Sequence, residues 1–343
     1  MLLLRRRSLA ILAAGGLCSR AAAAADTPAA IHGGGSSFVS PVMARWTEGA
    51  KSKGMSVEYA VLGAGSSQNQ ILAGDIDYAA GELAMLSEKL RLAELVQFPV
   101  VFGAITFSVN IEGIADGQLR LNAALLGGIF SGALKKWNDP AIAAANPGPA
   151  LPDLDIRPVF LGDTTGAVFS TSTTLVRYLM ANNADWQAKF TTKIGSRWAV
   201  GSMVPTSAAM VPLLKSRPGG IGYMALGTAL SNKLPRVVLQ NKSGEMLLPS
   251  PASLQTTVSK IDWKASPDLV VNATDLPGAG VWPLVLCSYA VMSRAAAKKD
   301  RAEKVRAFFT YALNDGGDAA IASSALPLPA EAKAKVLELL SKA

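Results

Sequence analysis

The chain of 343 residues, half of them apolar, exceeds the usual size of one hydrophobic core, so two domains are expected. Its formal net charge of +8 is modest, and its basic residues form no run interleaved with aromatic side chains. This pattern argues against a nucleic-acid partner.

The first 25 residues have the three-part pattern of a secretory signal peptide. Arg5–Arg7 precede an apolar stretch from Leu9 to Leu17, and the alanines at 21–25 supply the small residues of a cleavage site. The apolar stretch is too short to cross a bilayer. We therefore expect a signal peptide over residues 1–25 that directs export to the periplasm, by either the Sec or the twin-arginine route.

Removal of this segment changes the charge and the cysteine content of the mature chain. It carries four arginines and no acidic residue, so the formal charge falls from +8 to +4. Cys18 leaves with the signal, because Leu17 before it is not the small residue that lipidation requires. Cys287 then remains alone and cannot form an internal disulfide. Its apolar surroundings in the sequence indicate a small buried hydrophobe.

Short β-like runs alternate with helical segments along the rest of the chain. Strands are expected at 56–61, 98–110, 156–161, 221–224 and 285–292, and helices at 66–73, 119–130, 168–180, 302–312 and 330–340. This alternation predicts an α/β fold with mixed or mostly parallel sheets.

Residues suited to catalysis or metal binding are sparse. His32 is the single histidine of the sequence, and it has no set of cysteines with which to form a transition-metal site. The sequence contains neither a Gly-x-Ser-x-Gly nucleophile motif nor a Walker loop. We predict no catalytic residue, no metal and no cofactor, and hence a protein that is not an enzyme.

Three segments rich in glycine and hydroxyl side chains lie where a strand is expected to turn into a helix, at 33–38, 63–68 and 162–167. The first N–H groups of a helix have no internal partner and favour an anion. Each segment taken singly also fits an ordinary helix cap. Three such turns in one chain favour a shared anion site.

Several distinctive motifs follow one another in a characteristic order. They are Gly33–Phe38 with Pro41 and Trp46, Asp77-Tyr78-Ala79 leading to Glu82, Gln97-Phe98-Pro99, Val109-Asn110, Lys135-Lys136-Trp137 with Asn146-Pro147-Gly148, Pro218–Tyr223 and Trp282-Pro283. In these motifs the chain resembles the periplasmic phosphate-binding proteins of the high-affinity phosphate importer. The resemblance implies a two-lobed periplasmic binding protein of type II, with mixed sheets flanked by helices and a two-strand hinge. Its first lobe would comprise residues 26–109 plus 283–343, and its second lobe residues 110–282.

The resemblance also implies ligand residues in the first two glycine-rich segments. The family's first hydroxyl and the backbone N–H after it match Ser37 and Phe38. The serine of the second segment falls on Ala64, and a small shift of register offers Ser66, which we take as the ligand residue. Glu82 replaces the aspartate that accepts a proton from bound hydrogen phosphate in the family.

The third segment departs furthest from the family pattern. Asp163, Thr165 and Gly166 match ligand-site positions, whereas Leu161 replaces the family's arginine and Ala167 its threonine. A hydrogen bond to a charged group contributes about 1.5–3 kcal/mol, so two or three lost bonds would weaken phosphate binding by roughly two to four decades.

The function implied by the resemblance is that of an exported, monomeric solute-binding protein. It would capture phosphate or a related oxyanion in a cleft between its lobes and deliver it to the membrane subunits of an ABC importer. The departures at Leu161 and Ala167 keep an alternative open. The same scaffold would then bind a less charged, neutral or cationic solute, or would have a non-transport interaction role in the cell envelope.

Overall fold

The computed structural model describes residues 30–342, apart from 163–168, 191–197, 199, 267, 296 and 297. The expected signal peptide lies outside the described residues, and so do Asp163, Thr165 and Gly166. Among the described residues, no helix is both long and apolar enough to cross a membrane.

The strands of the described chain form a large sheet and a small one. Their bounds are β1 (Ile31–Gly35), β2 (Val57–Val61), β3 (Tyr78–Gly81), β4 (Leu95–Asn110), β5 (Arg120–Leu121), β6 (Arg157–Leu161), β7 (Ser202–Val204), β8 (Gly220–Ala225), β9 (Val238–Gln240), β10 (Met246–Leu247), β11 (Val285–Ser293) and β12 (Leu326–Pro327). The large sheet has the order β2-β1-β3-β11-β4-β8-β6-β7, with β12 paired to β4, and the small sheet has the order β10-β9-β5.

Helices flank this sheet on both sides. They are α1 (Ser40–Lys51), α2 (Ala64–Ala73), α3 (Ser87–Leu92), α4 (Ala123–Ser131), α5 (Pro140–Ala145), α6 (Ser170–Asn182), α7 (Ala184–Phe190), α8 (Ser207–Lys215), α9 (Leu226–Ser231), α10 (Pro251–Ser259), α11 (Lys299–Asp315), α12 (Gly317–Ala322) and α13 (Ala330–Lys342). The predicted α/β class is confirmed.

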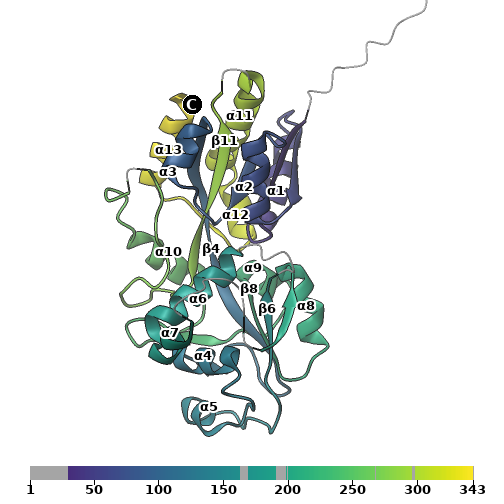
Figure 1. The fold of residues 1–343 in the computed structure, drawn as a ribbon, viewed down its shortest axis with the longest axis vertical. Helices are drawn as coiled ribbons and strands as arrows, with labels where there is room; N and C mark the ends of the chain where they lie inside the picture. Colours follow the sequence, from purple (N-terminus) through teal and green to yellow (C-terminus); the bar gives the residue numbers. More distant parts are fainter. Residues whose placement is uncertain are drawn as a thin grey trace, which may run out of the picture.

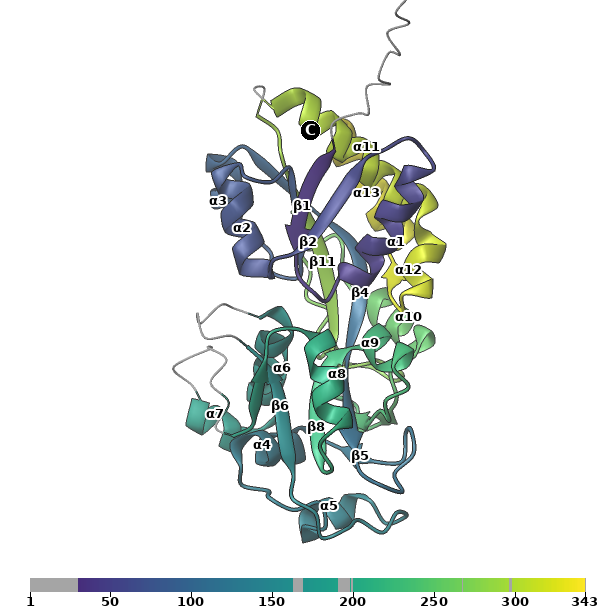
Figure 2. The ribbon, with the colours of Figure 1, turned by 90° about the vertical axis from the view of Figure 1, so that its right-hand side faces the viewer.

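Two lobes are visible, one above the other, and strands β4 and β11 run between them (Figures 1 and 2). The upper lobe holds β1–β3 with α1–α3 and α11–α13, and the lower lobe holds β6–β8 with α4–α8. Strand β4 pairs with β11 from Leu95 to Ala104 and with β8 from Ile105 to Asn110. It therefore belongs to the sheet of both lobes.

Each lobe combines parallel and antiparallel pairs. In the upper lobe β1 is parallel to β2 and β3, while β11 is antiparallel to β3 and β4. In the lower lobe β6 is parallel to β7 and β8, and β8 is antiparallel to β4. Both β4 and β11 are almost completely buried, which explains their continuous apolar sequences.

Three buried tryptophans from the characteristic motifs connect distant segments of the chain through hydrogen bonds from their indole N–H groups. The indole N–H of Trp46 donates to the carbonyl of Gly316 at 2.9 Å, and that of Trp137 donates to Gly219 at 3.0 Å. Trp282 donates to the carbonyl of Ile105 at 3.0 Å, where β4 passes between the lobes. A buried indole needs such an acceptor, so packing accounts for these motif positions.

Two local predictions are wrong. The prediction places Gly33–Gly35 in a turn, whereas they form the end of β1. A side chain there would be crowded out, since a Cβ on Gly35 would lie 1.7 Å from the Ala80 carbonyl oxygen. The predicted helix at 119–130 is also wrong over its first turn, where β5 forms and the Asn122 side chain caps α4 through the N–H of Leu125.

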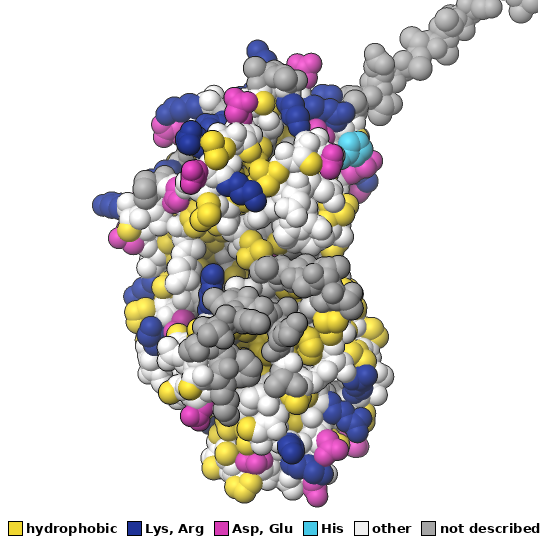
Figure 3. All heavy atoms as spheres, in the orientation of Figure 1, with side chains coloured by type: hydrophobic (Ala, Val, Ile, Leu, Met, Phe, Trp, Pro, Cys, Tyr) yellow, Lys and Arg dark blue, Asp and Glu magenta, His cyan; other side chains and the backbone are white. Residues whose placement is uncertain are grey.

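Charges of both signs are interspersed over the face seen in Figure 3, consistent with the mild net charge. His32 is exposed on β1 and lies 2.9 Å from the Glu58 carboxylate. Cys287 is buried within β11, as predicted. Among the described residues, no group of three or more His, Cys, Asp or Glu is arranged to hold a metal ion.

Candidate functional site

A cavity of about 290 Å³ lies at the carboxyl ends of parallel strands from both lobes; we call it the loop cavity. Its described lining residues are Ser36, Ser37, Phe38, Val61–Ser66, Leu161, Phe169–Thr171, Pro205 and Thr206. These residues follow β1, β2, β6 and β7, which run parallel in pairs. In open α/β sheets this edge is the usual place for a ligand.

Two helices reach the loop cavity with first turns that carry no side-chain cap. Gly63 precedes α2 and Phe169 precedes α6, and neither helix has a capping side-chain hydrogen bond. Gly63 has φ +83°, a conformation that glycine adopts without strain. By contrast, α4 and α8 are capped by Asn122 and Thr206. The uncapped N–H groups of α2 and α6 give the cavity a positive electrostatic potential, although no lining side chain in the described part is charged.

The structure brings three of the predicted ligand residues together at the loop cavity. Ser37, Phe38 and Ser66 all line it, and so does Ala64, the other position considered for the second segment. The backbone N–H of Phe38 donates to the hydroxyl oxygen of Ser36 at 3.0 Å. The remaining predicted residues of the third segment lie outside the described residues.

Leu161, the position where the resemblance led us to expect arginine, also lines the loop cavity. Its side chain is only 2 % exposed. Its N–H donates to the Tyr223 hydroxyl at 3.2 Å, and its carbonyl accepts from the Ser172 hydroxyl at 2.8 Å. The replacement is therefore an integral part of the packed end of β6.

Glu82 is buried beside the loop cavity but is not among its lining residues. Three serine hydroxyls from separate segments surround its carboxylate. Ser36 lies 2.8 Å from both carboxylate oxygens and donates its one proton to either, Ser170 donates to Oε2 at 2.6 Å, and Ser288 donates to Oε1 at 3.2 Å. We call these four residues the Glu82 cluster.

The Glu82 cluster joins the two lobes, because Ser170 begins α6 of the lower lobe while Glu82 follows β3 of the upper lobe. Burial raises the pKa of the Glu82 carboxyl above its ordinary value, and the hydrogen bonds from Ser170, Ser36 and Ser288 oppose part of that rise. The Glu82 carboxylate thus already accepts hydrogen bonds from three serine hydroxyls without a ligand.

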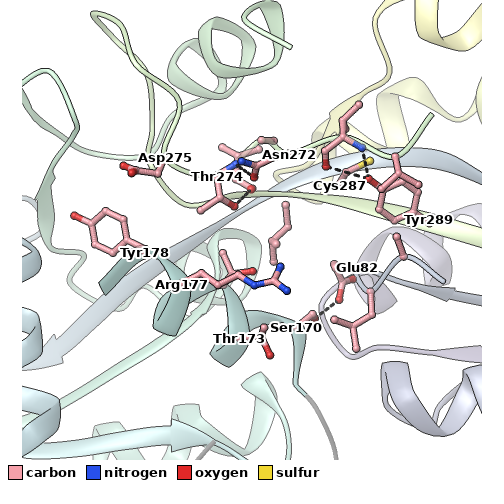
Figure 4. A pocket seen from close by; sticks show the side chains of 18 of the residues that line it. Glu82, Ser170, Thr173, Arg177, Tyr178, Asn272, Thr274, Asp275, Cys287 and Tyr289 are labelled. Carbon is pink, nitrogen blue, oxygen red and sulfur yellow. Dashed lines mark hydrogen bonds between the residues drawn. The ribbon is translucent and has the colours of Figure 1, made fainter. Parts of the chain in front are cut away.

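A second, larger cavity of about 720 Å³ lies on the other side of the Glu82 cluster; we call it the arginine pocket. Figure 4 shows Arg177 extending from α6 into its middle, between Ser170 and the segment containing Asn272 and Thr274. Glu82 and Ser170 line this pocket, and Ser170 also lines the loop cavity. The two cavities are therefore neighbours separated by the Glu82–Ser170 contact.

Sequence reasoning missed Ser36, Ser170, Ser288 and Arg177. The sequence does contain a signal for Ser170 and Arg177. Within the predicted helix, one face carries the polar side chains of Ser170, Thr173, Thr174 and Arg177. That polar face on a helix between two buried strands indicates a cavity rather than the core. Ser36 and Ser288 carry no such signal, because their role depends on contacts with distant segments.

The two-lobed architecture, the strand-borne hinge and the ligand-sized cavity between the lobes define the class of solute-binding proteins. A family model described as the PBP superfamily domain matches residues 22–315. The chain belongs to the PstS family of phosphate-binding proteins. It is 32 % identical to the phosphate-binding protein PstS of Haemophilus influenzae over 303 residues, which cover 88 % of this chain and 90 % of that protein. It is also 32 % identical to PstS of Xylella fastidiosa over 87 % of this chain and 81 % of that protein.

Solved structures agree with this fold. The phosphate-binding protein of Stenotrophomonas maltophilia superposes with a TM-score of 0.66 at 20 % identity, covering 90 % of this chain and 93 % of that chain. A structure from Clostridium perfringens, described as a putative phosphate ABC transporter substrate-binding protein with bound phosphate, gives a TM-score of 0.62 at 14 % identity. It covers 88 % of this chain and all of that one. The predicted two-lobed binding-protein fold is confirmed.

Proposed function

We propose that this chain is an exported, non-catalytic solute-binding protein that captures phosphate or a related oxyanion in the loop cavity. It would act in the periplasm as a monomer and deliver its ligand to the membrane subunits of an ABC importer. The names of its relatives support phosphate as the ligand, and the description of the Clostridium perfringens protein supports the importer.

The observation that carries the proposal is the convergence of uncapped helix starts and hydroxyl groups on one small cavity. The first turns of α2 and α6 face it from opposite lobes, together with Ser37 and Ser66. Neutral donors of this kind bind an oxyanion with little need for a balancing cation. Closing the lobes on the ligand removes it from water, which strengthens each of these hydrogen bonds.

The ligand set of the proposal is Ser37, Phe38, Ser66, Glu82, Asp163, Thr165 and Gly166. The positions of Ser37, Phe38 and Ser66 around the loop cavity support their inclusion. Glu82 would act indirectly, because its carboxylate accepts hydrogen bonds from Ser36 and Ser170 and so fixes the orientation of these two lining residues. The lobe bounds 26–109 plus 283–343 and 110–282 belong to the same proposal, supported by the passage of β4 between the two sheets at Ala104 and Ile105.

Titration calorimetry of the mature chain with inorganic phosphate at neutral pH tests the proposal. We expect binding weaker than submicromolar, because Leu161 supplies no charge-assisted bond where the family has arginine. Ser37→Ala should weaken phosphate binding about tenfold or more, the worth of one hydrogen bond to a charged ligand. Ser52→Ala, which removes an exposed hydroxyl from the far end of α1, is the matched control. Equal affinity in both variants, or no binding at all, would contradict the proposal.

The buried Leu161 also favours a second candidate, in which the same scaffold binds a less charged solute. A thermal-shift screen of phosphate, sulfate, phosphite, phosphonates and amines separates the two, since a ligand that binds the folded chain raises its melting temperature. A response to amines or neutral solutes without a response to phosphate would favour this second candidate.

A further inference from the structure

We propose that the arginine pocket is a second binding site, for a small organic anion whose carboxylate or phosphate group pairs with Arg177. This site is distinct from the loop cavity, and its ligand is larger than inorganic phosphate. The inference goes beyond the proposed function and does not depend on it.

The size of the arginine pocket points to an organic ligand. Its volume of about 720 Å³ falls within the range of roughly 300–1,000 Å³ that is usual for sites of small organic molecules. The loop cavity, at about 290 Å³, is far smaller. An ion as small as phosphate would leave most of the arginine pocket filled with water.

The pocket contains a cation for which the described residues provide no partner. Arg177 is exposed, and none of the described residues forms a hydrogen bond or an ion pair with its guanidinium. A guanidinium offers a planar pair of N–H donors that matches a carboxylate or a phosphate.

The other charged side chains of the arginine pocket already have polar partners within the protein. Lys242 lies 3.7 Å from Asp275, whose carboxylate also accepts from the Asn182 amide at 3.0 Å. The Glu82 carboxylate receives its serine hydroxyls. Arg177 therefore gives the pocket its preference for an anion.

The walls around Arg177 suit the body of an organic acid that carries hydroxyl groups. On one side α6 presents the hydroxyl of Thr173 beside that of Ser170, and on the other the segment 270–275 presents Asn272 and Thr274. Apolar wall comes from this segment and from β11, at Val270, Ala273 and Leu286. Segment 270–275 is held against β11, since the N–H of Val271 donates to the Tyr289 hydroxyl at 3.0 Å.

A ligand in this pocket would touch both lobes at once. Arg177 belongs to α6 of the lower lobe, whereas Glu82–Ala84 follow β3 of the upper lobe. An anion bound there would stabilise the lobe arrangement seen in this structure, from the side of the Glu82 cluster opposite the loop cavity.

The test is calorimetric titration of the mature chain with L-malate, with glycerol 3-phosphate and with inorganic phosphate. Arg177→Gln removes the guanidinium, and Arg91→Gln removes an exposed arginine of α3 as a control for the charge change. We expect malate or glycerol 3-phosphate to bind the native chain and the Arg91→Gln variant equally. Arg177→Gln should weaken that binding at least tenfold and leave the affinity for inorganic phosphate unchanged. Binding of malate alone assigns a carboxylate ligand, and binding of glycerol 3-phosphate alone assigns a phosphate ester.

Three results would overturn the inference: neither organic anion binds, Arg177→Gln binds it as tightly as the native chain, or inorganic phosphate displaces it competitively. Competitive displacement would place the organic anion in the loop cavity. The affinity for inorganic phosphate by itself tests the proposed function, so the two proposals fail separately. Melting curves of both variants establish that each is folded before the titrations are compared.

Discussion

Replacing Ser170 by alanine should shift the protein toward its open form. The Ser170 hydroxyl donates to the Glu82 carboxylate at 2.6 Å, and both residues are buried, at 6 % and 7 % exposure. A hydrogen bond to a charged group contributes about 1.5–3 kcal/mol, which corresponds to roughly 10- to 150-fold in an equilibrium constant. Glu82 keeps the hydroxyls of Ser36 and Ser288, so the loss falls on the contact between the lobes.

Small-angle scattering of the ligand-free chain, combined with a distance measurement between dyes on the two lobes, would report this shift. Ser288→Ala is the matched control, because it removes a second serine hydroxyl from the same carboxylate. Ser288 pairs with Val101 within the upper part of β4, so its loss should lower the free energy of unfolding without separating the lobes. Identical scattering and dye distances in the Ser170 variant and the native chain would refute the role of the Glu82 cluster between the lobes.

Other predictions concern single side chains. Leu161→Arg should tighten phosphate binding about tenfold or more in calorimetry, because it restores a charge-assisted donor at the loop cavity; no gain would indicate a cavity shaped for another ligand. Glu82→Gln should flatten the pH dependence of the unfolding free energy. Burial raises the folded-state pKa of Glu82, so its stabilisation is full below the ordinary value of about 4.5 and is lost as pH rises through the raised value. Denaturant curves across this window would show the change, and an unaltered slope would contradict it. Burial also raises the pKa of the Cys287 thiol, so a thiol reagent should label it slowly in the native chain and rapidly in urea; fast native labelling would disprove its burial.

The sequence predicts the fold well where an element has one dominant environment. The long apolar runs of β4 and β11 were predictable because both strands are buried on both faces. The short strand β1 was not, because Gly33–Gly35 have the composition of a turn. Their glycines are required by close contact, since a Cβ on Gly33 would lie 2.0 Å from the ring of Tyr78. That neighbour is known only once the sheet has formed.

The candidate site was predictable only where it is local. Ser37 and Phe38 lie in the turn before α1 and Ser66 lies in the first turn of α2, and all three line the loop cavity. The Glu82 cluster joins positions far apart in the chain, with Ser288 lying 206 residues from Glu82. Sequence spacing contains no information about such a contact. The arginine pocket is equally non-local, because its walls come from α6, β11 and the segment between α10 and β11.

The course of β4 determines what kind of hinge the protein has. At Ile105 the partner of β4 changes from β11 to β8. The N–H of Ile105 donates to the Leu284 carbonyl at 2.9 Å, and the Ile105 carbonyl accepts from the Trp282 indole. Because the crossing strand stays hydrogen-bonded on either side of this residue, opening cannot take place as free rotation about a loose linker. It must bend and twist strands that remain hydrogen-bonded to each other. Any change in the angle between the lobes therefore deforms paired strands, so the backbone itself limits how far and in which direction the lobes can move.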